Sequence, residues 1–272
     1  MGTLRANWWK ILASIFVAVF VDVILHRFFA PRIEYNFPPS IFVEKGLFLL
    51  AAGVALIILF GIVAIVFTLI QENMPGTKAM KGWRYGIAFG VLCFLSIIEM
   101  SLIFDSFLVD ELRTAAIDGV SLILLGLLLA WLTGTNGRVV RQPAKQGWIS
   151  FILVPLFFFI GRYFSYAVVH IMSAYLEKPE ATLLWTLGIG LWIGIMYWLL
   201  WEDRDDISTI KAAIRFGGLA FGSYWLIYNL FVLLFVKVSI SDVVIRVVLD
   251  VVFVTASIWI AKLAEQKATI KG

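Results

Sequence analysis

The stretch FVDVILHRFF, residues 20–29, places Asp22, His26 and Arg27 inside a run that is otherwise apolar. A charged side chain inside a membrane is costly unless it is paired or hydrated, so such residues are candidates for ion, proton or substrate sites. Asp22 and His26 are four residues apart and would therefore lie on one face of a helix. This face is the first place in the sequence where chemistry could occur.

Arg162 has a matching place in a later apolar run. It follows Trp148 by the same number of residues by which Asp22 follows Trp8. If the two tryptophans mark one membrane boundary, Asp22 and Arg162 have the same depth, and we predict an ion pair between them. The pair could be a structural clamp or a substrate or proton site, or the two charges could reach the interface separately and never meet.

Other polar side chains in apolar runs predict a hydrated cavity in the same half of the membrane. Tyr166 and His170 follow Arg162 at intervals of four, which places them on one face of a continuous helix. The candidates for ligand binding or ion pairing are Asp22, Arg162, Glu99, Asp118, Asp250, Tyr166, His26, His170 and Asn229. Asp118 and Asp250 could instead lie near the headgroups, and both histidines could be neutral interfacial residues.

The composition defines the elements that must position these residues. Of the 272 residues, 62% are hydrophobic and 15% are charged, with a mean hydropathy of +0.97, which indicates an integral membrane protein. Apolar runs of about 20 residues predict transmembrane helices. Eight are expected, over residues 8–29, 42–70, 83–105, 112–133, 148–175, 181–201, 209–236 and 243–263. The fold class is therefore all-α, a polytopic bundle forming a single transmembrane domain over residues 1–272.

The chain also contains an internal repeat. FLVDELRTAAIDGVSLILL (107–125) aligns without gaps on SISDVVIRVVLDVVFVTAS (239–257) and superposes Asp118 on Asp250. WRYGIAFG (83–90) is similar to IRFGGLAFG (214–222) when one inserted residue is allowed. We interpret the chain as two four-helix repeats, 7–133 and 147–264, which an even number of crossings would place in parallel orientation. Several glycines predict close helix contacts, namely Gly53, Gly61, Gly86, Gly90, Gly188, Gly190 and Gly194.

The motif GWRYGIAFG after a basic turn, with a tryptophan-rich fourth helix, resembles small uncharacterised four-helix prokaryotic membrane proteins, here in tandem. The resemblance implies a fold and no activity.

The distribution of basic residues predicts the orientation. Most lie in the N-terminus, the C-terminus and the loops that share their side, so both termini are expected in the cytoplasm and the protein in the cell (inner) membrane. The expected partners are membrane lipids, a small polar or anionic ligand, and other membrane subunits. The net charge of +4 is explained by this topology, and nucleic acid is not an expected partner.

Several kinds of chemistry lack the residues that they need. Two histidines are too few for a multi-histidine iron or zinc centre, and the single Cys93 excludes cysteine-based clusters. No metal, cofactor or catalytic residue is expected. The sequence favours a transporter or ligand-binding protein with an outward-facing polar cavity between the repeats. The alternatives are a non-catalytic subunit of a membrane complex and, less favoured, an enzyme acting on a lipid or isoprenoid.

Overall fold

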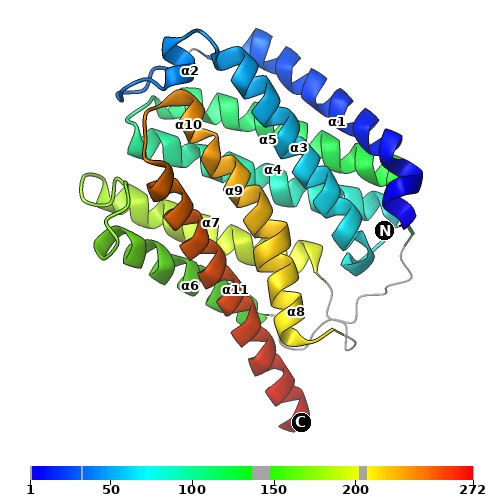
Figure 1. Ribbon diagram of the computed structural model, residues 1–272. Helices are drawn as coiled ribbons and strands as arrows, with labels where there is room; N and C mark the ends of the chain where they lie inside the picture. Colours follow the sequence, from blue (N-terminus) through cyan, green and yellow to red (C-terminus); the bar gives the residue numbers. More distant parts are fainter. Residues whose placement is uncertain (1, 32, 137–147, 202–206, 272) are drawn as a thin grey trace.

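The computed structural model describes residues 2–31, 33–136, 148–201 and 207–271 (Figure 1). Throughout these ranges the regular structure is helical, which confirms the all-α class. Eight of the described segments are long and apolar enough to cross a membrane, consistent with a multi-pass integral membrane protein. Residues 137–147 and 202–206, where two of the basic loops were expected, lie outside the described residues.

The spans are formed by the following elements. In chain order they are α1 (Gly2–Phe29), α2 (Ile41–Glu44), α3 (Phe48–Ile70), the 3₁₀ turn η1 (Gln71–Asn73), α4 (Lys78–Ile103), α5 (Leu108–Thr133), α6 (Trp148–Ala167), α7 (Pro179–Leu200), α8 (Thr209–Ala213), the π-helix η2 (Ile214–Gly222), α9 (Ser223–Leu230), α10 (Val232–Phe235) and α11 (Ile240–Lys271). Most ends lie within a few residues of the predicted ones, as expected for boundaries inferred from hydropathy.

The second span begins later than predicted because a turn separates α2 from α3. Ser40 caps α2 by accepting a hydrogen bond from the Val43 N–H, and Gly46 follows with a φ of +68°. This left-handed backbone conformation is open to glycine and strained for other residues, so the helix restarts only at Phe48.

The fifth span ends earlier than predicted. We expected a helix to residue 175, but α6 ends at Ala167. The Met172 N–H donates to Asp242 Oδ1 at 3.0 Å, and the Met172 carbonyl accepts from Arg246. Side chains of α11 therefore satisfy backbone groups of this segment, and the helix does not continue.

Packing between helices places the candidate residues in two separate regions. α5 lies along α4 and α1, whereas α6 lies along α7 and α11. α4 contacts α7 and α3 contacts α9, which joins the two groups of helices. Figure 1 shows α1 and α6 at opposite edges of the bundle. Residues on α1 and α6 therefore face different neighbours.

The closest contact between long helices involves glycines, as predicted for Gly86 and Gly90. A Cβ added at Gly86 would lie 2.8 Å from the Ile123 Cα, and one at Gly90 would lie 2.6 Å from the Gly119 carbonyl oxygen. Real Cβ atoms do not approach backbone atoms this closely, so α4 and α5 need these glycines to pack as they do. The same prediction is wrong for Gly53, Gly61 and Gly188, where nothing lies within 4 Å of an added Cβ.

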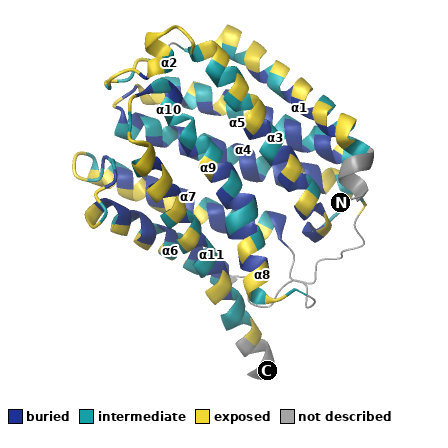
Figure 2. Ribbon diagram, in the orientation of Figure 1, coloured by how far each residue is buried: buried dark blue, intermediate teal, exposed yellow. Residues whose placement is uncertain are grey.

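The outward faces of the bundle are apolar. Figure 2 shows exposed residues along the outer sides of α1 and α6, with buried residues facing the interior. Phe16 and Leu49, for example, are 71% and 84% exposed. Large apolar side chains on this outer surface suit contact with lipid. The polar residues that follow are thus enclosed on several sides by apolar groups.

Candidate functional site

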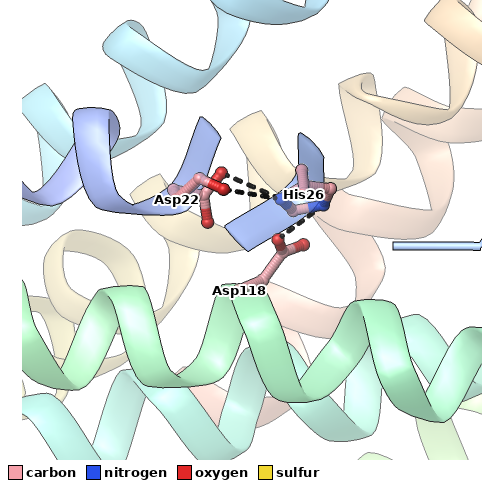
Figure 3. Close-up of side chains that lie close together, drawn as sticks. All are labelled: Asp22, His26 and Asp118. Atoms are coloured by element: carbon pink, nitrogen blue, oxygen red, sulfur yellow. Dashed lines mark hydrogen bonds and ion pairs between the residues drawn. The ribbon is translucent and has the colours of Figure 1, made fainter. Parts of the chain in front are cut away.

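Asp22, His26 and Asp118 form a compact group between α1 and α5, which we call the His26 cluster (Figure 3). His26 Nδ1 lies 3.3 Å from Asp22 Oδ2 and 3.1 Å from the Asp22 carbonyl oxygen. His26 Nε2 lies 3.3 Å from Asp118 Oδ1. The imidazole therefore stands between two carboxylates that come from different helices.

The His26 cluster holds two carboxyl groups and one imidazole. With both carboxyl groups ionised the formal charge is −2 with a neutral imidazole and −1 with a protonated one. In the described part of the chain, the ion pairs of Asp22 and Asp118 are with His26, and no lysine or arginine joins them. Asp22 Oδ1 is fully enclosed and has no hydrogen-bond partner there. This arrangement favours an additional cation.

The cluster is buried on one side and accessible on the other. The Asp22 side chain is 4% exposed, whereas those of His26 and Asp118 are 33% and 26% exposed. A cavity of about 40 Å³ adjoins Asp118, and its other lining residues are apolar side chains of α3 and α5, Cys93 of α4, and Tyr228 and Phe231. This volume can hold a water molecule or a small ion. The outward-facing polar cavity that we predicted stays a prediction, and this small space adjoins one of its expected lining residues, Asp118.

Glu99, Arg162, Arg246 and Asp250 form a second group, the Arg162 cluster, between α4, α6 and α11. The Arg162 Nη1 lies 3.0 Å from Glu99 Oε1, and its Nη2 lies 2.9 Å from Asp250 Oδ2. Arg246 Nη1 also approaches Glu99 Oε1, at 3.1 Å. The formal charges of these four side chains cancel, so this cluster needs no added ion.

Aromatic side chains enclose Arg162. Its guanidinium carbon lies 5.2–5.5 Å from the ring centres of Phe158, Trp185 and Trp225, a distance at which cations are attracted to aromatic faces. The side chain has no exposed surface. A charge so completely enclosed is held in one place, as suits a fixed contact between helices.

Trp225 connects the aromatic shell to the acids, because its Nε1 donates a 2.8 Å hydrogen bond to Asp250 Oδ2. We expect Trp225→Phe to keep the ring and lose this donor, at a cost of about 1–3 kcal/mol in the free energy of unfolding, since a buried carboxylate oxygen loses a partner. Chemical unfolding in detergent, followed by circular dichroism, would measure it. Trp131→Phe, at an exposed position, is the matched control, and equal stabilities of the two variants would contradict the prediction.

The predicted pair between Asp22 and Arg162 is not formed, and this prediction was wrong. Asp22 lies 3.3 Å from His26, and Arg162 pairs with Glu99 and Asp250. The reason is the helix packing: α1 lies on α5, and α6 lies on α11. The helix of Asp22 therefore contacts Asp118 of α5 through His26, and the helix of Arg162 contacts Asp250 of α11 through Arg162.

The remaining predicted residues have different surroundings. Tyr166 is buried and stacks on Tyr175, with ring centres 5.6 Å apart. Asn229 is buried and donates from Nδ2 to the Trp225 carbonyl at 2.8 Å. His170 is exposed, with a φ of +59°, beyond the end of α6. Its predicted position on the helix face of Arg162 is wrong, because α6 ends three residues earlier.

The sequence analysis missed Arg246, which it assigned to no site. A signal was present, because Asp242, Arg246 and Asp250 follow each other at intervals of four and so lie on one face of α11. It also missed Glu111, whose Oε1 accepts a 2.6 Å hydrogen bond from Ser106. Beside it, burial and then the negative charge of Glu111 raise the pKa of Tyr35, which keeps this phenol neutral.

A larger hollow, of about 580 Å³, lies elsewhere. It is formed by the start of α4 and the end of α5, around Thr77, Leu127 and Trp131. No residue of the His26 or Arg162 cluster lines it, and its surface is mostly apolar. Size alone therefore does not identify the site. The His26 cluster is distinguished instead by two carboxyl groups that have no lysine or arginine partner among the described residues.

Comparison of the chain with protein-family models, with curated proteins and with solved structures found no match, so the case for a function rests on these two clusters.

Proposed function

We propose that the protein is a transporter or ligand-binding protein of the cell membrane, that its ligand site is the His26 cluster, and that its ligand is a small cation. The observation that carries this proposal is that two carboxyl groups within the membrane-spanning segments, Asp22 and Asp118, share one imidazole and have no lysine or arginine partner among the described residues. An acid at such a depth costs about 2.5–3.5 kcal/mol on insertion scales, and ionisable residues there are typical of ion and proton pathways. A cation would neutralise the site. A cation is proposed here instead of the anionic ligand expected from the sequence, because Arg162 has no exposed surface with which to bind an anion.

The helix arrangement supports two related four-helix units. The first would contain α1, α3, α4 and α5, and the second α6, α7, the composite helix α8 to α10, and α11. In each unit the first helix lies on the last, and the contacts between units are reciprocal, α4 with α7 and α3 with α9. Asp118 and Asp250 occupy equivalent places and face the first helix of their own unit. Both termini would be cytoplasmic and the units parallel.

The π-helix η2 (Ile214–Gly222) supports the same relationship. It covers IRFGGLAFG, the segment that aligns on WRYGIAFG of α4 only with one inserted residue. A π-helix pairs residues five apart instead of four, so it takes an extra residue into a continuous helix. The insertion is absorbed locally, and the alignment of the following residues is kept.

The two units would then have different roles. The Arg162 cluster is neutral, fully buried and enclosed by aromatic rings, which suits a clamp between α4 of the first unit and α6 and α11 of the second. The His26 cluster is charged and partly accessible, and it adjoins a cavity. A second candidate function, a structural subunit of a membrane complex, is favoured by the clamp alone and would need no ligand at His26.

Flux measurements separate these candidates. We expect proteoliposomes of the full chain to take up protons or divalent cations, detected with an entrapped pH-sensitive or metal-sensitive dye. Asp118→Asn should reduce uptake to the level of protein-free vesicles, because it removes half of the site's negative charge. Asp110→Asn is the control and should be active, because Asp110 is an acid of similar exposure two turns earlier on α5 that pairs with Arg113 instead of His26. Equal uptake by Asp118→Asn and the wild type would refute the proposal.

A further inference from the structure

We propose that the His26 cluster binds a divalent transition-metal ion of the zinc class, with His26 Nε2 and Asp118 Oδ1 as ligands and Asp22 as the residue that positions the imidazole. This inference rests on the proposed function and names its cation. No metal site was expected from the sequence, because two histidines are too few for a multi-histidine centre. The His26 cluster has instead one histidine and two carboxyl groups, one from a neighbouring turn of the same helix and one from another helix.

The distances fit such an ion. Zinc bonds to imidazole nitrogen and carboxylate oxygen are about 2.0–2.2 Å long, so neighbouring tetrahedral ligand atoms lie about 3.3–3.5 Å apart. His26 Nε2 and Asp118 Oδ1 are 3.3 Å apart. One ligand atom from each of the three residues lies within 4.8 Å of the others. The separation of His26 Nε2 and Asp118 Oδ1 therefore matches that of two ligand atoms of one zinc ion.

The other nitrogen of His26 has the partner that metal-bound histidines usually have. Nδ1 faces the Asp22 carboxylate at 3.3 Å and the Asp22 carbonyl at 3.1 Å. Such an acceptor fixes the tautomer, so that Nδ1 carries the proton and Nε2 presents its lone pair to the metal. Figure 3 shows the three side chains as a triangle, with dashed lines from His26 to Asp22 and from His26 to Asp118.

One divalent cation neutralises the cluster in a single binding step. With both carboxyl groups ionised and a neutral imidazole, a divalent cation brings the formal sum to zero, whereas neutralisation by protons needs two, one on His26 and one on a carboxyl group. The burial of Asp22 is a second observation that points to a ligand. Its side chain is 96% buried, and its Oδ1 has no hydrogen-bond partner among the described residues. A buried carboxylate with an unpartnered oxygen is costly unless a positive charge lies nearby.

The ligand types favour a transition metal over calcium or magnesium. Those two ions take oxygen ligands almost exclusively, whereas imidazole suits zinc, copper, iron and nickel. Two protein ligands leave coordination positions open, and the adjoining 40 Å³ cavity can hold a water in one of them. The exposed sides of His26 and Asp118 offer an entry path.

Binding to the purified full chain tests the inference. We expect isothermal titration with ZnCl₂ to give one site, which MgCl₂ does not occupy. His26→Gln and Asp118→Asn should lose binding. Asp22→Asn should weaken it by about 10–100-fold, as for other residues that orient a ligating histidine. Asp22→Glu should restore part of the affinity, and the metal-free melting temperature of Asp22→Asn should stay near that of the wild type. His170→Gln, at the only other histidine, is the matched control.

A measurement on the wild type keeps the test valid if a variant does not fold. Diethyl pyrocarbonate modifies accessible imidazoles, and mass spectrometry reports each histidine separately. We expect ZnCl₂ to protect His26 and leave His170 reactive. Absence of a zinc site, or equal zinc affinity in His26→Gln and the wild type, overturns the metal inference. If proton uptake in proteoliposomes then still depends on Asp118, the proposed function stands with a proton as its cation; if no uptake depends on Asp118, both fail.

Discussion

Arg162→Met is expected to lower the free energy of unfolding by about 3–5 kcal/mol, the usual cost of removing one partner from a buried ion pair. The guanidinium lies 3.0 Å from Glu99 and 2.9 Å from Asp250, and it has no exposed surface. Its loss leaves Asp250 with the hydrogen bond from the Trp225 indole, inside an apolar shell. Chemical unfolding in detergent, followed by circular dichroism, would measure the change.

Two further variants show whether charge is the cause. Arg162→Met with Asp250→Asn should recover much of the loss, because Arg246 still neutralises Glu99 and no unpaired carboxylate remains. Arg113→Met is the surface control: Arg113 is 63% exposed and lies 3.8 Å from Asp110, so the cost should stay below about 1 kcal/mol. If the double variant is no more stable than Arg162→Met, lost packing and not unpaired charge explains the effect.

Gly126→Val is expected to cost about 3 kcal/mol or more, at or above the upper end of the usual penalty for overpacking. A Cβ at Gly126 would lie 2.6 Å from the Gly86 nitrogen and 2.7 Å from the Gly86 Cα. These are backbone atoms of α4, so no side-chain rotation can relieve the contact. α4 and α5 would have to separate, which also moves Asp118 relative to His26.

The control for this variant is Gly53→Val on α3. No atom lies within 4 Å of a Cβ at Gly53, which belongs to a helix whose outer surface is apolar. We expect its melting temperature to equal that of the wild type and that of Gly126→Val to be lower. Equal melting temperatures for the two variants would show that the α4–α5 contact tolerates a larger spacing.

If the chain consists of the two proposed units, the two clusters differ in the residues at equivalent places. In the proposed second unit Asp250 faces Arg162 and receives a hydrogen bond from Trp225. In the other, Asp118 faces His26, and Cys93 stands at the place that the repeat alignment assigns to Trp225. Cys93 is much smaller than tryptophan and lines the cavity beside Asp118. Under the proposed relationship, one unit kept a closed, neutral contact and the other kept a charged site with space for a ligand.

The sequence by itself determined the class of the protein and the approximate place of its helices. Membrane-spanning helices need long apolar runs and satisfy their own backbone hydrogen bonds, so hydropathy predicts them locally. The pairing of Asp22 with His26 was also predictable, because it follows from helical spacing alone. The selection of candidate residues depended on the same local rule, that charge is rare in apolar runs.

Only the tertiary structure decided which candidates meet. Depth in the membrane fixes one coordinate of a side chain, but two residues at equal depth can belong to helices at opposite edges of a bundle, as the helices of Asp22 and Arg162, α1 and α6, are (Figure 1). The partner of each was set by which helices pack together, and that depends on close contacts such as Gly86 with α5, which join residues far apart in sequence. Charge balance, the property that separates the His26 cluster from the Arg162 cluster, could be read only once those partners were known.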